Sequence, residues 1–219
     1  MNHNLQEKGE KKIPKPFKNL DQEKQQRILD AALKEFAEQG YEQASTNRMV
    51  KDAGIGKGML FYYFKNKKEL FHYLVDYSLD ITIHHYLEQI DTEEKDFIER
   101  LKQTSAIKMK TFLENPNVFN FMGTILLSKP DELPKNYHEK FEELQRIGFE
   151  KIYGDIDKSL FREDIDVDKA FQLIQWSMDG YQNEKKTQLQ GQKMSEIDFE
   201  YYIEEFNEYL DLMKRTFYK

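Results

Sequence analysis

The sequence predicts an all-α protein, with a small helix-turn-helix head at the N-terminus and a larger helical body, about nine helices in all. Three observations favour this fold class. Apolar residues recur at three- and four-residue spacings along most of the chain. No window shows sustained strand alternation bounded by hairpin turns. Only five prolines and ten glycines occur among 219 residues, which is typical of long helices with few tight turns.

Composition excludes several classes of protein. Hydrophobic residues make up 39% of the chain and aromatic residues 14%, enough for a packed core rather than a disordered chain. No stretch approaches the ~20 apolar residues of a membrane span, and the first twenty residues lack the apolar segment of a secretory signal. The absence of cysteine excludes disulfides, thiol nucleophiles and cysteine-ligated metals. We therefore expect a cytoplasmic protein that does not contact membranes.

Charge is distributed unevenly along the chain. Residues 1–70 contain 14 Lys and Arg against 10 Asp and Glu, whereas residues 71–219 contain 19 against 30. This asymmetry indicates an N-terminal part that meets a polyanion and a larger part that does not. An ordinary helical surface preceded by a lysine-rich tail would give the same asymmetry.

Residues 1–20 are polar and predict a flexible basic arm. The arm's lysines form either a solvated tail or additional contacts to phosphates or the minor groove; they are Lys8, Lys11, Lys12, Lys15 and Lys18. From Asp21 onward, apolar residues follow one helical face until Gly40, which is expected to end this first helix.

Two short helices follow, and their arrangement is that of a helix-turn-helix. The first begins at Ser45 or Thr46 and the second covers residues 57–64, with a glycine-containing turn between them. In such a motif the second helix lies in the major groove of DNA. Residues 21–67 therefore form the predicted DNA-binding domain, and residues 68–219 the predicted body.

The side chains of the second short helix support this interpretation. Leu60 and Phe64, four residues apart, are expected to face the core, which leaves other positions outward. The residues expected to face outward are Lys57, Met59, Tyr62 and Tyr63. Exposed tyrosines suit a DNA surface, because the hydroxyl donates to phosphate and the ring packs on sugars or a thymine methyl.

The body is predicted to consist of longer helices. A long helix begins near residue 68, and Asp91 with Glu94 resembles a capping box that opens the next helix, which Pro116 ends. A short and very apolar helix over 117–128 and a further helix over 135–153 follow.

The last two predicted helices have the most regular apolar pattern. Their heptad-like seams predict an antiparallel hairpin that pairs with a second copy to form a four-helix bundle, although a monomeric core uses the same spacing. The predicted interface residues are Val167, Phe171, Ile174 and Met178 on one helix and Phe199, Ile203, Phe206 and Leu210 on the other. Flanking apolar residues, among them Leu173 and Tyr209, widen both faces.

The run from Ser45 to Lys68, STNRMVKDAGIGKGMLFYYFKNKK, resembles the DNA-binding signature of the tetracycline-repressor (TetR/AcrR) family of bacterial transcription regulators. The preceding run RILDAALKEFAEQGYEQAST is similar to the same family, as are the chain length and the order of head, long helix and body. The resemblance implies a homodimer that binds double-stranded operator DNA and is released by a small-molecule effector.

The resemblance also implies roles for individual residues. Thr46 would bind a phosphate at a helix N-terminus, and Lys67 another phosphate at the start of the fourth helix. Base and groove contacts would come from Asn47, Lys57, Gly58, Met59, Tyr62 and Tyr63. Gly56, Met59 and Phe61 depart from the serine, threonine and tyrosine that are frequent at these positions, so base readout is expected to be more apolar.

An effector pocket is expected in the body and, if present, to take a lipophilic or aromatic molecule. The candidate lining residues, each of which could equally be plain core, are Met109, Phe112, Phe119, Met122, Phe141, Phe149 and Trp176. No catalytic, cofactor or metal motif is found, so we expect neither an enzyme nor a cofactor. The alternatives are a regulator of the same fold without a small ligand, and a helical interaction protein that does not bind DNA.

Overall fold

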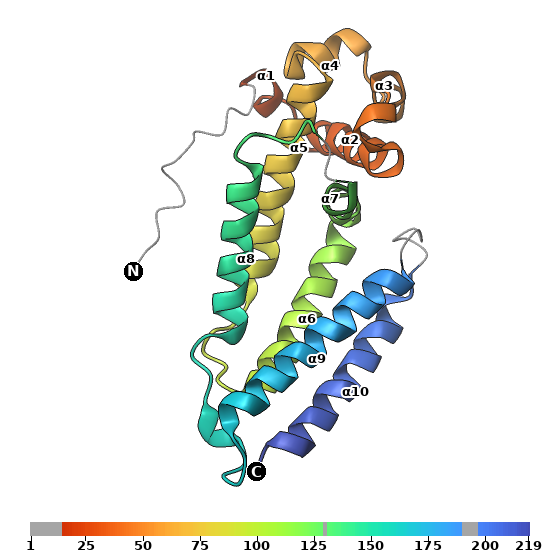
Figure 1. Ribbon diagram of the computed structural model, residues 1–219. Coiled ribbons are helices and arrows are strands. Elements are labelled where there is room, and N and C mark those ends of the chain that lie inside the picture. Colours follow the sequence, from red (N-terminus) through yellow and green to blue (C-terminus); the bar gives the residue numbers. More distant parts are fainter. Residues whose placement is uncertain (1–14, 129–130, 190–196) are drawn as a thin grey trace. The chain divides into compact units, whose positions relative to one another are not determined.

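The computed structural model describes residues 15–128, 131–189 and 197–219 (Figure 1). These residues form helices, helical turns and loops, and their one β-type pairing is an isolated bridge between Phe161 and Tyr218. The predicted all-α fold is confirmed. Within the same residues, no helix combines the length and apolarity that crossing a bilayer requires.

The chain divides into two compact units. The head unit comprises Met1–Asp80 with Asn117–Lys135, and the body unit comprises Ile81–Pro116 with Asn136–Lys219. The head helices are α1 (Lys15–Lys18), α2 (Gln22–Gln43), α3 (Thr46–Ala53), α4 (Lys57–Phe64), α5 (Lys67–Ile81) and α7 (Pro116–Ser128). The body helices are the π-turn η1 (Thr82–Tyr86), the 3₁₀ turns η2 (Leu87–Gln89) and η3 (Lys158–Leu160), α6 (Phe97–Glu114), α8 (Tyr137–Tyr153), α9 (Val167–Gln188) and α10 (Phe199–Phe217).

Local sequence explains where the head helices begin and end. The Asp21 side chain accepts a hydrogen bond from the Lys24 N–H at 2.8 Å and so caps α2. Gly40, which was expected to end the helix, has a φ of 67° and kinks it, and the helix then continues to Gln43. Ser45, rather than Thr46, caps α3. Gly54 ends α3 in the left-handed conformation, with a φ of 66°.

Aromatic rings connect several helices in the core of the head unit. The ring of Phe36 on α2 lies 5.1 Å from that of Phe71 on α5, and Phe71 in turn lies 5.5 Å from Phe121 on α7. Phe64 at the end of α4 is also buried. The expectation that Leu60 and Phe64 face the core is therefore confirmed.

Part of the predicted arm belongs to this core. Residues 15–18 form α1, and the Phe17 side chain is fully buried against Tyr63 and Phe64 of α4 and Tyr73 of α5. The prediction of a flexible arm over residues 1–20 is wrong for this turn, because burial of one phenylalanine outweighs the polar composition around it. Residues 1–14 lie outside the described residues.

The N-terminal cap of α6 in the body unit differs from the predicted cap. Helix α6 starts at Phe97 and is capped by Asp96, whose side chain accepts the N–H groups of Ile98 and Glu99. The expected Asp91–Glu94 capping box does not form, because Asp91 instead accepts the N–H of Glu93 within a turn.

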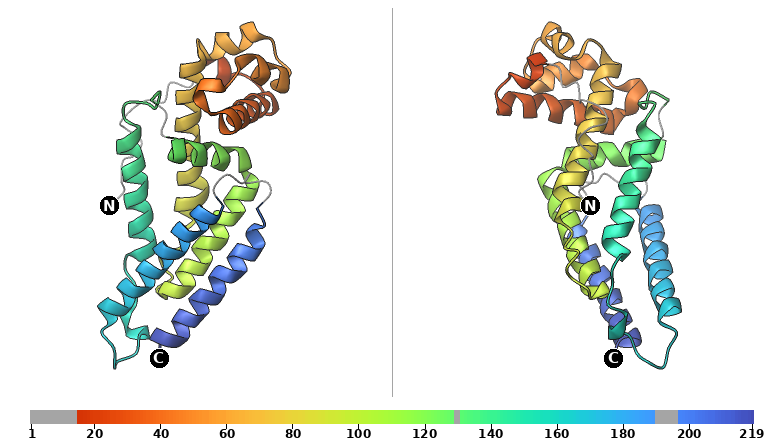
Figure 2. Two further views of the ribbon diagram at one scale, coloured as in Figure 1. Left: turned by 45° about the vertical axis from the view of Figure 1, so that its right-hand side comes forward. Right: turned by 90° about the vertical axis from the view of Figure 1, so that its left-hand side faces the viewer.

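Helices α6 and α10 run side by side (Figures 1 and 2), and polar contacts of residues near the C-terminus hold them together. The Lys214 ammonium lies 2.7 Å from carboxylate oxygens of both Asp96 and Glu99, and the Tyr218 hydroxyl donates to Asp96 at 3.0 Å. Burial alone raises the pKa of Asp96, but the hydrogen bonds from Lys214, the Glu99 N–H and Tyr218 outweigh burial and lower it. Burial and the nearby charge of Asp96 raise the pKa of the Tyr218 hydroxyl.

The α9–α10 hairpin has a different apolar arrangement from the one predicted. The two helices run antiparallel as expected (Figure 1), but Ile174, Met178 and Leu210 are fully buried within the protomer, in a core with residues of α6. The partly buried Val167, Phe171 and Phe206 pack against the same core.

These predicted interface residues therefore cannot all meet a second copy, because α6 already covers much of the seam. Ile203 is half-buried, and the Phe199 side chain lies outside the described residues. The large apolar side chains that remain exposed on this hairpin are Leu173, Trp176, Tyr201, Tyr209 and Leu212.

Candidate nucleic-acid interface

Helices α3 and α4 and the turn between them form the helix-turn-helix of the head unit. The left-handed conformation at Gly54 reverses the chain, and the Ile55 N–H donates to Val50 O at 3.0 Å, which closes the end of α3. Gly56 then starts α4 without a side-chain cap. Glycine offers no side-chain acceptor for the first N–H groups of α4.

The outer face of α4 carries basic and aromatic side chains. Lys57 and Gly58 are exposed, Met59 is half-buried, and Tyr62 is 68% exposed. The Lys57 ammonium lies 6.0 Å from the ring centre of Phe61. Such a face can donate to phosphates through the lysine and the tyrosine hydroxyl, and the glycine leaves the backbone open to a groove wall.

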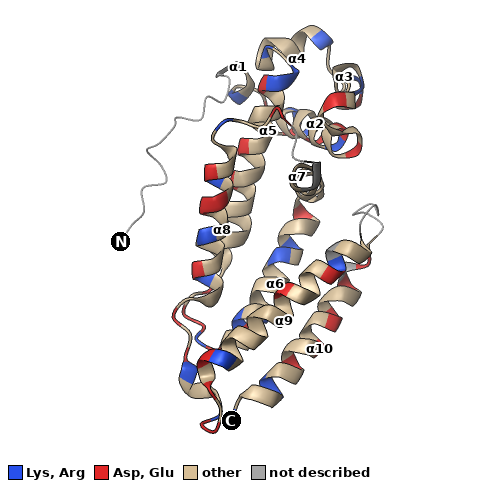
Figure 3. Cartoon of the chain, viewed as in Figure 1, with Lys and Arg blue, Asp and Glu red and all other residues tan. Residues whose placement is uncertain are grey.

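Two further predicted contact residues lie at the start of α3. Thr46 is the first residue of that helix and is half-buried, whereas Asn47 is exposed. The N-terminal N–H groups of a helix attract anions, so this end can take a phosphate. Blue lysine positions mark α1 and both ends of α4 on the head unit (Figure 3).

Tyr63 does not face outward as the sequence suggested. Its side chain is only 7% exposed, and its ring lies 5.7 Å from Phe17 and 5.6 Å from Tyr62. The prediction failed because Phe17 adds a buried surface on the side of α4 that would otherwise be open. Tyr63 therefore packs α4 against the core of the head unit.

Lys67 makes hydrogen bonds within the protein rather than pointing freely into solvent. Its ammonium donates to the carbonyls of Tyr41, Glu42 and Ala44, at 2.8, 3.2 and 3.4 Å, and lies 4.6 Å from the Tyr41 ring centre. It thus satisfies the carbonyls at the C-terminal end of α2, where a cation is favoured. The phosphate role implied by the family resemblance would require this ammonium to be shared or released.

Sequence analysis did not single out the ion pair that supports the start of α3. Arg48 on α3 donates from Nε and a terminal nitrogen to the buried carboxylate of Glu35, at 2.5 to 3.0 Å. The same carboxylate accepts the Ser45 N–H at 2.8 Å. Burial raises the pKa of Glu35, but the Arg48 and Ser45 hydrogen bonds outweigh burial and lower it. The sequence did contain a signal for this ion pair: a glutamate occupies an apolar position of one predicted helix, and an arginine lies in the next helix.

The residues of the predicted effector pocket are divided between the two units. Phe119 and Met122 belong to the head unit, whereas the other members lie in the body unit; these are Met109, Phe112, Phe141, Phe149 and Trp176. Phe149 and Trp176 are exposed, so neither lines an enclosed site in the protomer. None of the seven lines either of two hollows on the body unit.

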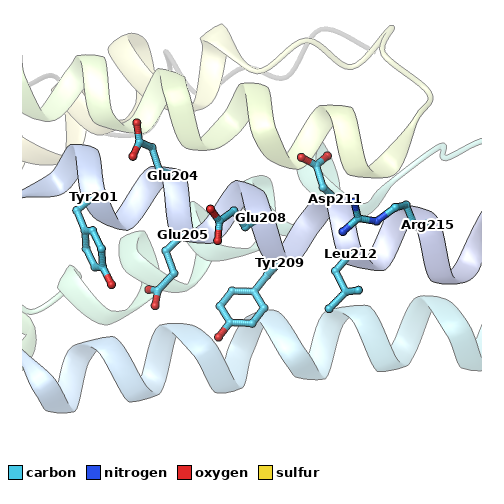
Figure 4. Close-up of a pocket in the computed structure, with 8 residues that line it drawn as sticks. All are labelled: Tyr201, Glu204, Glu205, Glu208, Tyr209, Asp211, Leu212 and Arg215. Atoms are coloured by element: carbon cyan, nitrogen blue, oxygen red, sulfur yellow. The ribbon is translucent and has the colours of Figure 1, made fainter.

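One of these hollows is an open face of α10. Tyr201, Tyr209 and Leu212 alternate there with the carboxylates of Glu204, Glu208 and Asp211, and Arg215 lies at one end (Figure 4). The second hollow lies beside the C-terminal residue, between Ser159 and Lys219. An open face of apolar and charged side chains suits contact with another protein surface better than enclosure of a small molecule. Among the described residues, no cluster of potential metal ligands is found.

Comparison with known proteins agrees with the geometry of the head. Residues 28–74 match a family model described as bacterial regulatory proteins, tetR family. An HTH-type transcriptional regulator of Staphylococcus aureus (strain USA300) is 45% identical over 64 residues, which cover 29% of this chain and 35% of the relative. The match thus spans about a third of that relative's length.

Solved structures resemble nearly the whole chain in fold. A TetR family transcriptional regulator from Chloroflexus aurantiacus J-10-FL superposes with a TM-score of 0.60 at 21% identity, covering 94% of this chain and 98% of that chain. The TetR family regulator PfmR from Thermus thermophilus gives 0.59 at 23% identity, with 86% and 97% covered. The regulator FadR from Bacillus subtilis, in complex with stearoyl-CoA, gives 0.50 at 20% identity, with 86% and 96% covered.

Proposed function

This chain belongs to the tetR family of bacterial regulatory proteins, and from that premise we propose that it is a homodimeric, sequence-specific DNA-binding transcriptional repressor. The observation that carries the proposal is the outer face of α4, where exposed Lys57, Gly58 and Tyr62 follow a turn of helix-turn-helix geometry. In the proposed complex α4 enters the major groove, while the first turn of α3 meets a phosphate through Thr46.

The proposed protein–DNA contacts fall into two classes, those to the phosphate backbone and those to base edges. Lys57 and Tyr62 donate to the phosphate backbone, and Asn47, Gly58 and Met59 approach base edges. Because Gly56 and Met59 bring no hydroxyl to the first turn of α4, we expect an operator in which apolar contacts to thymine methyl groups contribute to recognition.

A dimer is proposed because one head contacts only one half-site. Two α4 helices entering successive major grooves require half-sites about 34–36 Å apart, or a multiple of that spacing, and a near-palindromic operator. The exposed apolar side chains of α9 and α10 are the surface that we assign to the second copy. Two such hairpins packed together give a four-helix bundle.

We further propose that a lipophilic effector releases the repressor from DNA. The body is rich in aromatic and aliphatic residues, and the structurally similar FadR from Bacillus subtilis was solved with stearoyl-CoA. An effector can act only by binding the released conformation better than the DNA-bound one. A thermal-shift screen with long-chain acyl-CoA, and with free coenzyme A as the control, tests this part: stabilisation by neither would contradict an acyl-CoA effector.

The proposed DNA binding is tested by selection from a random duplex library with the purified protein. The enriched duplex is then titrated at several salt concentrations, with wild-type protein and with Lys57→Gln. We expect a near-palindromic site, tight binding that weakens steeply with salt, and a smaller salt slope for the variant. Lys110→Gln, at an exposed position on α6, is the matched control. Absence of binding at low salt would contradict the proposal and favour a helical interaction protein.

A further inference from the structure

The junction between α4 and α5 is a turn of only two residues, Lys65 and Asn66. The Lys65 N–H donates to the Phe61 carbonyl at 3.0 Å, and the Asn66 N–H donates to the Phe64 carbonyl. The Asn66 side chain then accepts the Glu69 N–H at 2.8 Å and so caps the start of α5. These hydrogen bonds hold Lys65 at a fixed place directly after the last residue of α4.

The backbone of Lys65 has a conformation that a lysine rarely adopts. Its φ is 45° and its ψ is −51°, and the hydrogen bond across it forms a γ-turn with a positive φ, the strained form of this turn. A glycine would adopt such a φ without a steric penalty. Strained residues of this kind cluster at functional sites. The lysine side chain at this position therefore requires an explanation beyond the turn itself.

The Lys65 side chain is exposed at the end of the proposed DNA-binding face of α4. Lys65 follows Tyr62 by three residues and Gly58 by seven, and this spacing places all three exposed residues on one side of the helix. In the part of the chain that the structure describes, the Lys65 ammonium has no carboxylate within ion-pair distance. By contrast, Lys102 and Lys214 of the body unit lie 2.5 and 2.7 Å from carboxylate oxygens.

Lys67, to which the family resemblance assigns a phosphate contact, has different surroundings. Its ammonium donates to the carbonyls of Tyr41, Glu42 and Ala44 at the end of α2. A lysine ammonium has three N–H donors, so these three contacts use all of them. Of the two lysines, Lys65 is therefore the one whose donors remain open to a phosphate.

We propose that Lys65 is the residue that binds phosphate at the end of α4, in place of Lys67, and that the strained turn holds its ammonium beside Tyr62 toward the DNA backbone. This inference rests on the proposed DNA binding and adds one contact to each half-site. A lysine meets a phosphate as a point charge. The contact therefore adds affinity and salt dependence without changing the preferred operator sequence.

The experiment titrates the selected operator at several salt concentrations with the wild type and with Lys65→Gln and Lys65→Arg. A dimer loses one phosphate contact in each half-site, so Lys65→Gln is expected to lower the slope of log K against log salt by about 1.8, at about 0.9 per contact. Lys65→Arg keeps the charge and is expected to keep the slope. The consensus from a new library selection with Lys65→Gln should be unchanged. Lys110→Gln, at an exposed position of the body unit, is the matched control.

A variant of the neighbouring lysine tests the exchange of roles. Lys67→Gln is expected to unfold at a lower temperature, because the carbonyls at the end of α2 lose a charged donor, but to keep the wild-type salt slope. Circular dichroism confirms that the head is folded at the titration temperature. A reduced slope for Lys67→Gln, with an unchanged slope for Lys65→Gln, would overturn the proposal.

Two small substitutions separate the strain from the charge. Lys65→Ala and Lys65→Gly both remove the ammonium, but only the glycine variant also removes the Cβ that makes a positive φ unfavourable. Both are expected to lose the same salt slope as Lys65→Gln, and Lys65→Gly is expected to melt at a higher temperature than Lys65→Ala. A lower melting temperature for the glycine variant would overturn the strained turn.

The outcomes also separate this inference from the proposed function. If the wild type binds its operator and Lys65→Gln binds with equal affinity and slope, the Lys65 contact is refuted while DNA binding stands. An equal loss of slope in Lys65→Gln and Lys65→Arg would refute the role of the charge. Failure of the wild type to bind any duplex would refute the proposed function itself.

Discussion

Tyr62 and Tyr63 are adjacent on α4, but their side chains have opposite environments. Tyr62 is 68% exposed, whereas Tyr63 is 7% exposed and packs on Phe17 and Phe64. A helix places consecutive residues about 100° apart, so one can face solvent while the next faces the core. The two hydroxyaromatic side chains therefore have separable effects on binding and on stability.

We expect Tyr62→Ala to weaken operator binding with little change in the free energy of unfolding. Tyr63→Ala should instead lower the free energy of unfolding by about 3 kcal/mol, as for other buried aromatic side chains replaced by alanine. Urea unfolding and a DNA titration of each variant measure both effects. Equal destabilisation by the two substitutions would contradict this assignment.

Glu35 should make the stability of the head depend on pH. Its pKa in the folded protein lies below the ordinary value because Arg48 and the Ser45 N–H outweigh burial. A lowered folded-state pKa stabilises the fold above the unfolded-state pKa, about 4.3, and this stabilisation disappears as pH falls through the folded-state value.

Glu35→Gln should therefore cost about 1–3 kcal/mol at neutral pH, the cost of a hydrogen bond to a charged group. The difference from wild type should shrink when urea unfolding is repeated below about pH 4. The exposed Glu38 on the same helix provides the control: Glu38→Gln is expected to change neither the stability at neutral pH nor its pH dependence. A pH-independent cost for Glu35→Gln would show that the charge is not involved.

At the scale of elements, Lys67 links the start of α5 to the end of α2. Its ammonium donates to three carbonyls that the end of α2 leaves without helical partners. The contact joins a helix of the helix-turn-helix domain to the helix that leads out of it. Movement of α5 would change the support of α2, and through the Glu35–Arg48 pair that of α3.

Replacing Lys67 by glutamine should lower the free energy of unfolding by about 1–2 kcal/mol, because charged hydrogen bonds to carbonyls are lost. The neighbouring Lys68 is exposed, so Lys68→Gln serves as the control and should be neutral. Chemical denaturation of both variants decides between a capping role and a free phosphate-binding lysine: an unchanged stability for Lys67→Gln would favour the latter.

The sequence was sufficient to predict the all-α class, the helix-turn-helix and most helix ends, because caps and glycine positions act locally. Ser45 caps the start of α3, and Gly54 ends this helix in the expected glycine-containing turn. The errors involve contacts between segments distant in sequence. Phe17 lies in a polar segment, yet its partners on α4 and α5 are more than forty residues away.

The hairpin of α9 and α10 illustrates the same limit. A heptad-like seam has the same spacing whether α6 or a second copy covers it, and no property of either helix alone decides between them. The fold assigns Ile174, Met178 and Leu210 to the protomer core. The predicted effector pocket stays a prediction for a related reason, since aromatic composition does not distinguish a cavity wall from packed core.

At the scale of the whole molecule, assembly should depend on the apolar side chains that remain exposed. Trp176 on α9 is 60% exposed and Leu212 on α10 is 52% exposed. Placing a carboxylate at both positions should give a monomer, because an unpaired charge at the centre of an apolar interface is not compensated.

The double variant Trp176→Glu, Leu212→Glu should sediment as a monomer and lose operator affinity by roughly 10²–10⁴-fold, the range that a linked second binding module supplies. Leu113→Glu is the control, because Leu113 is 67% exposed on α6 and outside the proposed interface. Analytical ultracentrifugation and a DNA titration test both consequences. A double variant that remains dimeric would place the interface elsewhere.

Trp176 is the single tryptophan of the chain, and it stands on the face assigned to assembly. Its indole emission therefore reports on one known position, without labelling and without a second tryptophan to subtract. In dilute solution, where the protein is a protomer, the Trp176 emission maximum should lie at the long wavelength of a hydrated indole. Association should shift this maximum to shorter wavelength, because water leaves the ring. The protein thus contains an optical probe of its own oligomerisation, which can be followed by dilution alone.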